Sequence, residues 1–357
     1  MTHSELDSPE IYERLDPEAI SGRIAGLPEQ IEEAWAAGSA LKLPPDYTAA
    51  ERIVVLGMGG SAIGGSLLQA LALELRAERP VLVARGYTAP RFADGNAVVF
   101  GCSASGNTEE TVSAFAQAAD AGAKSVAITT GGKLLAMARE RGLPALTFAW
   151  DGEPRSALGW GFATLAAICG GAGLLPDVGR ELPAALEHMR ALGRAIGREA
   201  PEASNPAKQL ARRLAGRLPV FVGAEFMTPV AYRWRTQVNE NGKSWAIAEE
   251  LPEMNHNGPV GYGLPAAAVP LLHIVLLRHE SMHPRIRLRV DATLEQMDAA
   301  GLTAEVLDVP GGHVLAQMLW AVHFGDWVSY YLGLLNGARP SPVVALDWLK
   351  AQMAAQA

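Results

Sequence analysis

The chain has 357 residues, of which 49% are hydrophobic and 19% are charged, a composition typical of a globular protein rather than of a disordered one. At this length two domains are expected. The net charge of -8 and the lack of a long basic run argue against a nucleic-acid or anionic-membrane surface. Cys102 and Cys169 lie in apolar runs, which predicts buried thiols in a reducing compartment. The start of the sequence is acidic and polar and does not resemble a secretory signal, so a cytoplasmic protein is expected.

The first part of the chain is predicted to be a helical arm without chemistry, followed by a strand and a glycine-rich turn. Helical spacing covers residues 9–41, and a strand is expected over 52–56. The glycines that follow superficially suggest a dinucleotide-binding fingerprint, but Ala62 occupies its third glycine position and no acidic residue ends the next strand, expected over 81–84. We therefore favour a glycine turn around Gly60, in which Ser61 and nearby backbone approach a smaller substrate, with a helix from about residue 66.

A hydroxyl-rich loop joins the next strand, at residues 97–100, to a helix that ends near residue 121. The loop contains Ser103, Ser105 and Thr108, and Thr108 stands at the expected N-cap position. Hydroxyls, backbone N–H groups and a helix N-terminus together suit a small anion, and a phosphate is predicted. The loop lacks the lysine of a nucleotide P-loop. The alternative is an ordinary capped turn between a strand and a helix.

Strands and helices continue to alternate along both halves of the chain, which predicts an α/β fold with doubly wound parallel sheets. In such sheets ligands bind beyond the carboxyl ends of the strands. Further strands are expected at residues 125–130, 146–149, 219–223, 271–277 and 304–309, and further helices at 134–141, 229–239, 285–300, 313–335 and 342–353.

Three further segments, at residues 157–176, 177–218 and 313–335, are expected to be helical. Residues 157–176 carry no charge and are long enough to span a bilayer, but they are rich in alanine and glycine, so a buried helix is preferred. Residues 177–218 are expected to be a polar helical spacer. The aromatic helix at 313–335 is expected to belong to the core or to a dimer surface rather than to a cofactor site.

Three residues outside the loops are candidates for chemistry. Arg155 follows a strand at the start of a helix and could reach a phosphate or a sugar oxygen, although a surface arginine fits equally well. Glu240 and His256 each lie in a polar stretch beside an apolar element, and a carboxylate with an imidazole suits proton transfer near neutral pH. A capping glutamate and a structural histidine are the alternative.

The sequence from His279 to His283 matches the H-E-x-x-H zinc pattern. That chemistry needs both histidines on one helix face. Here the motif follows a strand, and Pro284 disfavours a helical conformation at His283, so a loop without zinc is predicted.

Six ordered motifs closely resemble those of the bifunctional phosphoglucose/phosphomannose isomerases, a branch of the sugar isomerase (SIS-domain) superfamily. The resemblance covers about residues 50–350 and implies two SIS domains with the site between them. It also implies a cytoplasmic homodimer that requires no metal or other cofactor. The motifs are GMGGSAIGG, CSASGNTEET, ITTGGKL, EPRSALG, NENGK and PEMNHN.

The resemblance also implies a role for each site residue. Glu240 would move the proton between C2 and C1, and Arg155 would stabilise the enediolate. His256, supplied by the neighbouring subunit, and Lys350 would help to open the sugar ring. The phosphate would be held by Ser103, Ser105 and Thr108, which lie in the hydroxyl-rich loop already predicted to bind phosphate. Gly60 and Ser61 of the glycine-rich stretch would also contact it.

The expected activity is the interconversion of glucose 6-phosphate and fructose 6-phosphate. Mannose 6-phosphate is expected as a second substrate, although the tail Ser341-Pro342-Val343 departs from the threonine-bearing tail associated with its use. The alternatives are a non-catalytic sugar-phosphate sensor, an isomerase of another sugar phosphate such as an amino sugar, and a nucleotide-dependent dehydrogenase. The expected organisation is an arm (1–48), a first SIS domain (49–152), a helical linker (153–217), a second SIS domain (218–340) and a C-terminal helix (341–357).

Overall fold

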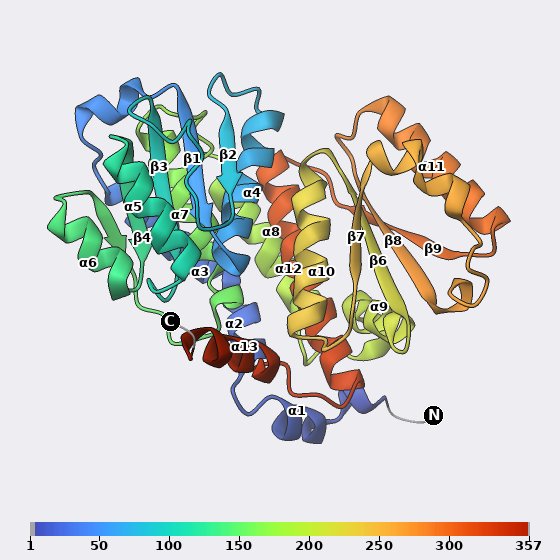
Figure 1. Cartoon of the computed structure of the whole chain (residues 1–357). Helices are drawn as coiled ribbons and strands as arrows, with labels where there is room; N and C mark the ends of the chain where they lie inside the picture. Colours follow the sequence, from blue (N-terminus) through green and yellow to red (C-terminus); the bar gives the residue numbers. More distant parts are fainter. Residues whose placement is uncertain (1–3, 356–357) are drawn as a thin grey trace.

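A computed structural model describes residues 4–355 and contains two parallel β-sheets side by side, each flanked by helices (Figure 1). The first, sheet A, has the strand order β2-β1-β3-β4-β5, and the second, sheet B, has the order β7-β6-β8-β9. All neighbouring strands are parallel, which confirms the predicted α/β class.

Sheet A is formed by short apolar runs whose central strands are buried on both faces, as expected when helices cover a parallel sheet. Its five strands were all predicted, with ends within about three residues. They are β1 (Arg52–Gly57), β2 (Val81–Ala84), β3 (Ala97–Ser103), β4 (Lys124–Thr129) and β5 (Ala145–Thr147).

Among the helices around sheet A, one is buried at the centre and packs against two others. That helix, α7 (Leu158–Gly171), is buried along almost its whole length against α3 and α4. This confirms a buried helix for the uncharged segment, and no helix between residues 4 and 355 is both long and apolar enough to cross a bilayer. The neighbouring helices are α3 (Leu27–Ala40), α4 (Gly59–Glu74), α5 (Glu109–Asp120) and α6 (Gly132–Glu140).

Sheet B contains three predicted strands and one that the sequence analysis missed. The missed strand, β7 (Ile247–Leu251), lies at the edge of the sheet, and its two glutamates, Glu249 and Glu250, are exposed. Polar residues in place of an apolar run are common on edge strands, which explains the omission. The other elements are β6 (Leu218–Ala224), α10 (Thr228–Glu240), β8 (Leu272–His279), α11 (Pro284–Ala299) and β9 (Thr303–Val309).

The long helix α12 (Val314–Leu335) forms the centre of the second half. It is apolar around its circumference and almost fully buried, and Trp327, Tyr330 and Tyr331 pack on one another within the core. The segment expected to be a polar spacer instead packs on this helix through α8 (Leu182–Ile196) and α9 (Pro206–Leu214). The segment is helical, as predicted, and both helices bury a regular apolar face while their other faces are polar.

The N-terminal arm braces the segment between the two sheets rather than only covering it. Arg23 pairs with Glu153 at 3.1 Å, and the Gln30 side-chain amide donates to Ser156 O and accepts from Gly159 N. The arm contains α1 (Pro9–Leu15) and α2 (Ile20–Ala25) before α3. Its contacts fix the chain on both sides of Arg155.

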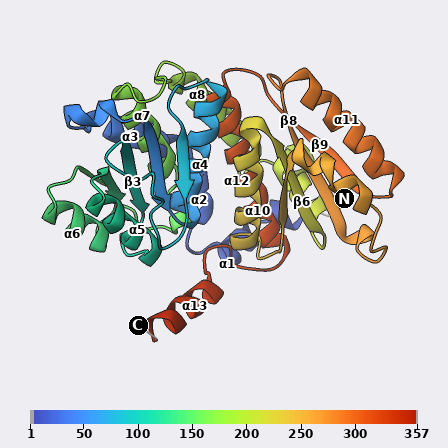
Figure 2. The same cartoon turned by 45° about the horizontal axis from the view of Figure 1, so that its top comes forward.

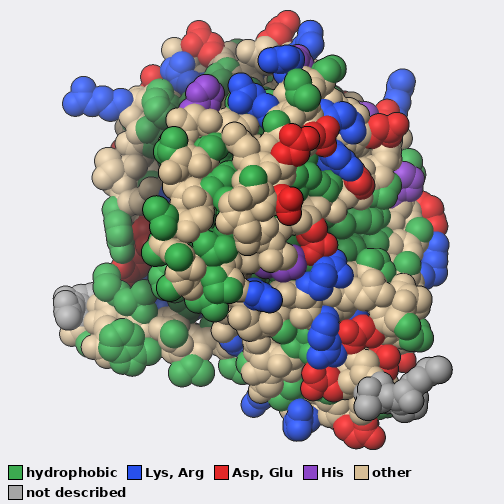
Figure 3. All heavy atoms as spheres, turned by 90° about the vertical axis from the view of Figure 1, so that its right-hand side faces the viewer, with side chains coloured by type: hydrophobic (Ala, Val, Ile, Leu, Met, Phe, Trp, Pro, Cys, Tyr) green, Lys and Arg blue, Asp and Glu red, His purple; other side chains and the backbone are tan. Residues whose placement is uncertain are grey.

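The C-terminal helix α13 (Val344–Ala354) projects from the body of the molecule (Figure 2). Its apolar side chains, including Val344 and Trp348, are exposed. The projecting segment is visible at the lower left of the space-filling view, where hydrophobic side chains cover it (Figure 3). On the face shown there, acidic and basic side chains are interspersed.

Short 3-10 turns connect many of these elements. They lie at Glu5–Asp7, Pro45–Ala49, Pro154–Ser156, Glu202–Ser204, Glu225–Met227, Glu253–His256, Gly258–Gly261 and Val269–Leu271.

Candidate active site

The first wall of the candidate site is the start of α4 at the carboxyl edge of sheet A. The helix begins at Gly59, so the predicted glycine turn is wrong, and Gly60 and Ser61 lie in the first helical turn. Gly59 has a φ of +49°, which lets the chain turn directly from β1 into the helix. A Cβ on Gly60 would lie 2.8 Å from Pro154 O and 3.1 Å from the Cα of Arg155, so glycine permits the close approach of that segment.

The hydroxyl-rich loop after β3 forms the second wall. Ser103 ends the strand, and its Oγ lies 2.9 Å from Oγ1 of Thr108 and accepts from Gly106 N. Thr108 occupies the N-cap position of α5 as predicted, but its side chain makes no capping hydrogen bond. The hydroxyls therefore cluster at the loop, and the start of α5 keeps N–H groups available to an anion. Ser61 and Ser103 line one small cavity with Pro154, so the two walls meet.

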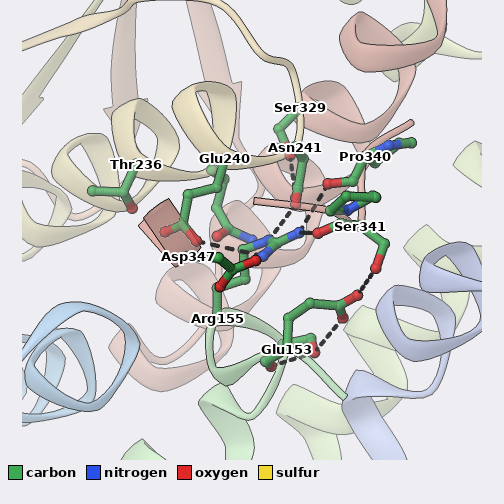
Figure 4. Close-up of polar contacts among 12 residues, drawn as sticks. Glu153, Arg155, Thr236, Glu240, Asn241, Ser329, Pro340, Ser341 and Asp347 are labelled. Carbon is green, nitrogen blue, oxygen red and sulfur yellow. Dashed lines mark hydrogen bonds and ion pairs between the residues drawn. The ribbon is translucent and has the colours of Figure 1, made fainter. Parts of the chain in front are cut away.

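Arg155 stands between the two sheets in the turn Pro154–Ser156 and is only 3% exposed, so the alternative of a surface arginine is wrong. Its Nη1 lies 3.4 Å from Oε2 of Glu240, and its Nε donates to Asn241 Oδ1 at 2.6 Å (Figure 4). Nη2 donates to the carbonyl oxygens of Pro340 and Ser341, both at 2.9 Å. Burial lowers the pKa of the guanidinium, while the nearby Glu240 and Glu153 oppose that change.

Glu240 is the last residue of α10, and its side chain is 29% exposed. A carboxylate at a helix C-terminus is unfavourable because the helix dipole places negative charge there, so the alternative of a capping glutamate does not fit. The ion pair with Arg155 offsets that cost and turns the carboxylate toward the guanidinium (Figure 4).

Lys243 joins this group, although the sequence analysis gave it no role. Its Nζ donates to Glu240 O at 2.6 Å, to Pro340 O at 2.9 Å and to Pro342 O. Burial and the charge of Arg155 lower the pKa of Lys243 to about 8. Its place in the NENGK motif was the available signal, but its acceptors lie about a hundred residues further along the chain.

Glu153 completes the contacts with the C-terminal segment. It accepts hydrogen bonds from Ser341 Oγ and from Arg23, so the tail before α13 is tied to both the arm and the candidate site. Burial alone would raise the pKa of Glu153, but the bond from Ser341 and the charges of Arg155 and Arg23 hold it below its usual range.

The structure does not bring His256 or Lys350 to this group within one chain. His256 is exposed and follows the carboxyl end of β7, whereas Glu240 lies near the edge of sheet B where β7 begins. Lys350 lies on α13, is 75% exposed and has Asp347 as its ion-pair partner at 3.8 Å. Between residues 4 and 355, neither side chain hydrogen-bonds to Arg155 or Glu240.

The H-E-x-x-H sequence is divided between a strand end and a loop, so the predicted loop is confirmed. His279 ends β8, residues 280–283 form the loop, and α11 begins at Pro284. His279 pairs with Glu225 at 3.1 Å, and His283 caps α11 through its Nδ1. No group of three potential ligands in the described part of the chain is arranged to hold a metal ion.

Comparison with known proteins agrees with this architecture. Residues 203–353 match the family described as bacterial phospho-glucose isomerase C-terminal SIS domain. A bifunctional phosphoglucose/phosphomannose isomerase of Caldicellulosiruptor bescii is 36% identical over 334 residues, covering 93% of this chain and 98% of that protein. One from Aquifex aeolicus is 34% identical and covers 86% of this chain and 92% of that protein. The fold also matches the crystal structure of a hypothetical protein of Thermus thermophilus, with a TM-score of 0.74, 18% identity and coverage of 97% and 92% of the two chains.

These findings define the protein first as an SIS-domain protein, because residues 203–353 match an SIS-domain family and both sheets are parallel α/β sheets. The identity and coverage of its relatives are sufficient for a narrower assignment. The chain belongs to the bifunctional phosphoglucose/phosphomannose isomerase family.

Proposed function

We propose that this protein is an aldose–ketose isomerase that interconverts glucose 6-phosphate and fructose 6-phosphate, and mannose 6-phosphate and fructose 6-phosphate. The observation that carries the proposal is the buried guanidinium of Arg155, 3.4 Å from the Glu240 carboxylate and beside the start of α4. A base and a fixed positive charge next to an anion-binding loop suit proton transfer on the carbons of a phosphorylated sugar.

In the proposed mechanism the substrate phosphate binds Ser61, Ser103, Ser105 and Thr108. Glu240 removes the proton from C2 of the open-chain aldose to give a cis-enediolate. A proton then moves from O2 to O1, and Glu240 returns the proton taken from C2 to C1 to give the ketose. Arg155 stabilises the negative oxygen that develops in this step. Binding of the distant phosphate contributes orientation at the reacting carbons.

Ring opening requires a proton to move between the ring oxygen and the anomeric hydroxyl, and we assign this step to His256 with Lys350. Because His256 lies at the opposite edge of sheet B from Glu240, the assignment requires a second chain. We therefore propose a homodimer in which His256 of one chain completes the site of the other.

The proposal retains the division into SIS domains at residues 49–152 and 218–340, which contain the strands of sheet A and sheet B, respectively. It also places the enzyme in the cytoplasm. Both cysteines are free and buried, as suits a reducing compartment, and burial raises the pKa of the Cys102 thiol to about 12.

The test is turnover of fructose 6-phosphate by the purified protein in EDTA, with glucose 6-phosphate and mannose 6-phosphate quantified separately. Formation of both products is expected. Formation of glucose 6-phosphate alone would be consistent with the mechanism but would exclude mannose 6-phosphate as a second substrate. Binding of the sugar phosphate without either product would favour the sensor, whereas turnover of an amino-sugar phosphate alone would reassign the substrate.

A further inference from the structure

The guanidinium of Arg155 is held in one orientation by three oxygen atoms of neighbouring residues. Nε and both hydrogens of Nη2 are directed to the oxygens of Asn241, Pro340 and Ser341. In the described part of the chain, the remaining nitrogen, Nη1, makes one contact, with Glu240. Since the group is planar, fixing Nε and Nη2 also fixes the direction in which Nη1 points.

Asn241 makes the shortest of these contacts and is itself 1% exposed. Its Oδ1 accepts from Arg155 Nε at 2.6 Å, and its Nδ2 donates to Ser329 Oγ at 3.1 Å on α12 (Figure 4). The side chain therefore connects the guanidinium to the central helix of the second half.

Ser329 determines which way round the Asn241 amide must lie. A serine hydroxyl has one hydrogen, and that of Ser329 is donated to Asp326 O at 2.7 Å. Ser329 can therefore only accept from Asn241, so the amide must present its NH₂ group to Ser329 and its oxygen to Arg155. The opposite orientation would place two N–H donors against each other on the Arg155 side.

The same stretch of α12 also holds the main chain of Arg155. Asp326 forms a buried ion pair with Arg233 of α10 at 2.7 Å, and Arg233 Nη2 donates to Arg155 O at 3.2 Å. The carbonyl oxygen of Arg155 is therefore connected to α12 through Arg233, and its guanidinium is connected to α12 through Asn241. The group cannot turn independently of the helix that carries Ser329.

We propose that Asn241 is a positioning residue for isomerisation, which aims Nη1 of Arg155 at the oxygen of the enediolate and is itself oriented by Ser329. This inference rests on the function proposed above. Because Asn241 is only 1% exposed, we expect no contact between it and the sugar, and its removal should act on the chemical step through Arg155 and leave the phosphate-binding loop unchanged.

The test measures kcat and KM for fructose 6-phosphate in Asn241→Ala, Arg155→Lys and the double variant. Asn241→Ala is expected to lower kcat about 10- to 100-fold, because a misdirected group loses much of its effect on the transition state, and to change KM less than about threefold. In the Arg155→Lys background, the ammonium is a point charge without a plane to orient, so adding Asn241→Ala should lower kcat less than about twofold.

Two further variants keep the test decisive. Gln296→Ala removes an exposed amide side chain from α11 and should leave kcat within about twofold of the wild type. If Asn241→Ala does not fold, as judged by circular dichroism, Ser329→Ala replaces it. That variant loses one hydroxyl and should lower kcat at least about threefold with an unchanged KM.

Three results would overturn the inference: a wild-type kcat in the folded variant, a loss confined to KM, or losses that multiply fully in the Arg155→Lys background. If Arg155→Lys itself retains wild-type turnover, then Arg155 has no catalytic role and the positioning role of Asn241 falls with it. A large loss in Arg155→Lys with none in Asn241→Ala would refute the positioning role alone.

Discussion

At the scale of single residues, the candidate site brings together charges that would be costly elsewhere. Glu240 stands at the unfavourable end of a helix dipole, and Arg155 is nearly removed from water. Each is stabilised by the other and by neutral acceptors around the guanidinium. Such an arrangement is more consistent with a functional requirement than with a contribution to stability.

Replacement of Glu240 by glutamine is the most direct test of its role as the base. Glu240→Gln keeps the size of the side chain but removes its basicity, so kcat should fall by about 10³-fold or more. The Kd for glucose 6-phosphate, measured by calorimetry, should stay within about threefold, since the loop proposed to bind the phosphate is unchanged. Glu249→Gln on the exposed edge strand serves as the control. Near wild-type turnover by the variant would remove Glu240 from the mechanism.

The sequence could indicate the candidate site residues that belong to local motifs but not those whose contacts come from distant parts of the chain. Glu240, Ser103 and Thr108 each lie beside recognisable turn and helix signals. Lys243 and Asn241 gain their roles from Pro340 and Ser329, which lie near the other end of the second half. Nothing in the local sequence indicates that those segments meet.

At the scale of elements, the buried parallel strands were predictable because each is a short apolar run between turn signals. The edge strand β7 was missed because its exposed glutamates interrupt that pattern. The start of α4 was misplaced because glycines favour a turn, whereas here they permit close packing of the helix. A Cβ on Gly64 would lie 2.3 Å from Gly161 O of α7, so α4 and α7 can touch only without that side chain.

Substitution of Gly64 by alanine tests this contact. The added methyl group must push α4 away from α7, so the free energy of unfolding in urea should fall by about 1–3 kcal/mol. KM for fructose 6-phosphate should also rise, because Gly60 and Ser61 lie one turn away on the same helix. In the matched variant Gly22→Ala, the new methyl group meets no atom within 4 Å and should raise stability by about 0.5–1 kcal/mol. Wild-type stability of Gly64→Ala would mean that the two helices are not held by this contact.

At the scale of the whole molecule, one chain supplies only part of the proposed chemistry. The hydroxyl-rich loop after β3 lies at the carboxyl end of sheet A, and Glu240 contacts Arg155 near the amino end of β7. His256 instead follows the carboxyl end of β7. The helix that carries Lys350 projects from the body with its apolar side chains exposed. A pairing of two chains is the simplest way in which His256 could approach Glu240.

Mixed dimers of two inactive variants would test whether the site is shared. If Glu240 of one chain works with His256 of the other, a dimer of Glu240→Gln and His256→Ala chains has one site with both residues intact. Random assembly of equal amounts should then restore about a quarter of the wild-type activity. Glu240→Gln mixed with Arg155→Met is the matched control, because these two residues contact each other within one chain and no dimer of those variants contains an intact site. With chain exchange verified by two affinity tags, no recovery in the first mixture would show that His256 does not act across an interface, whereas recovery in the first mixture alone would require it to do so.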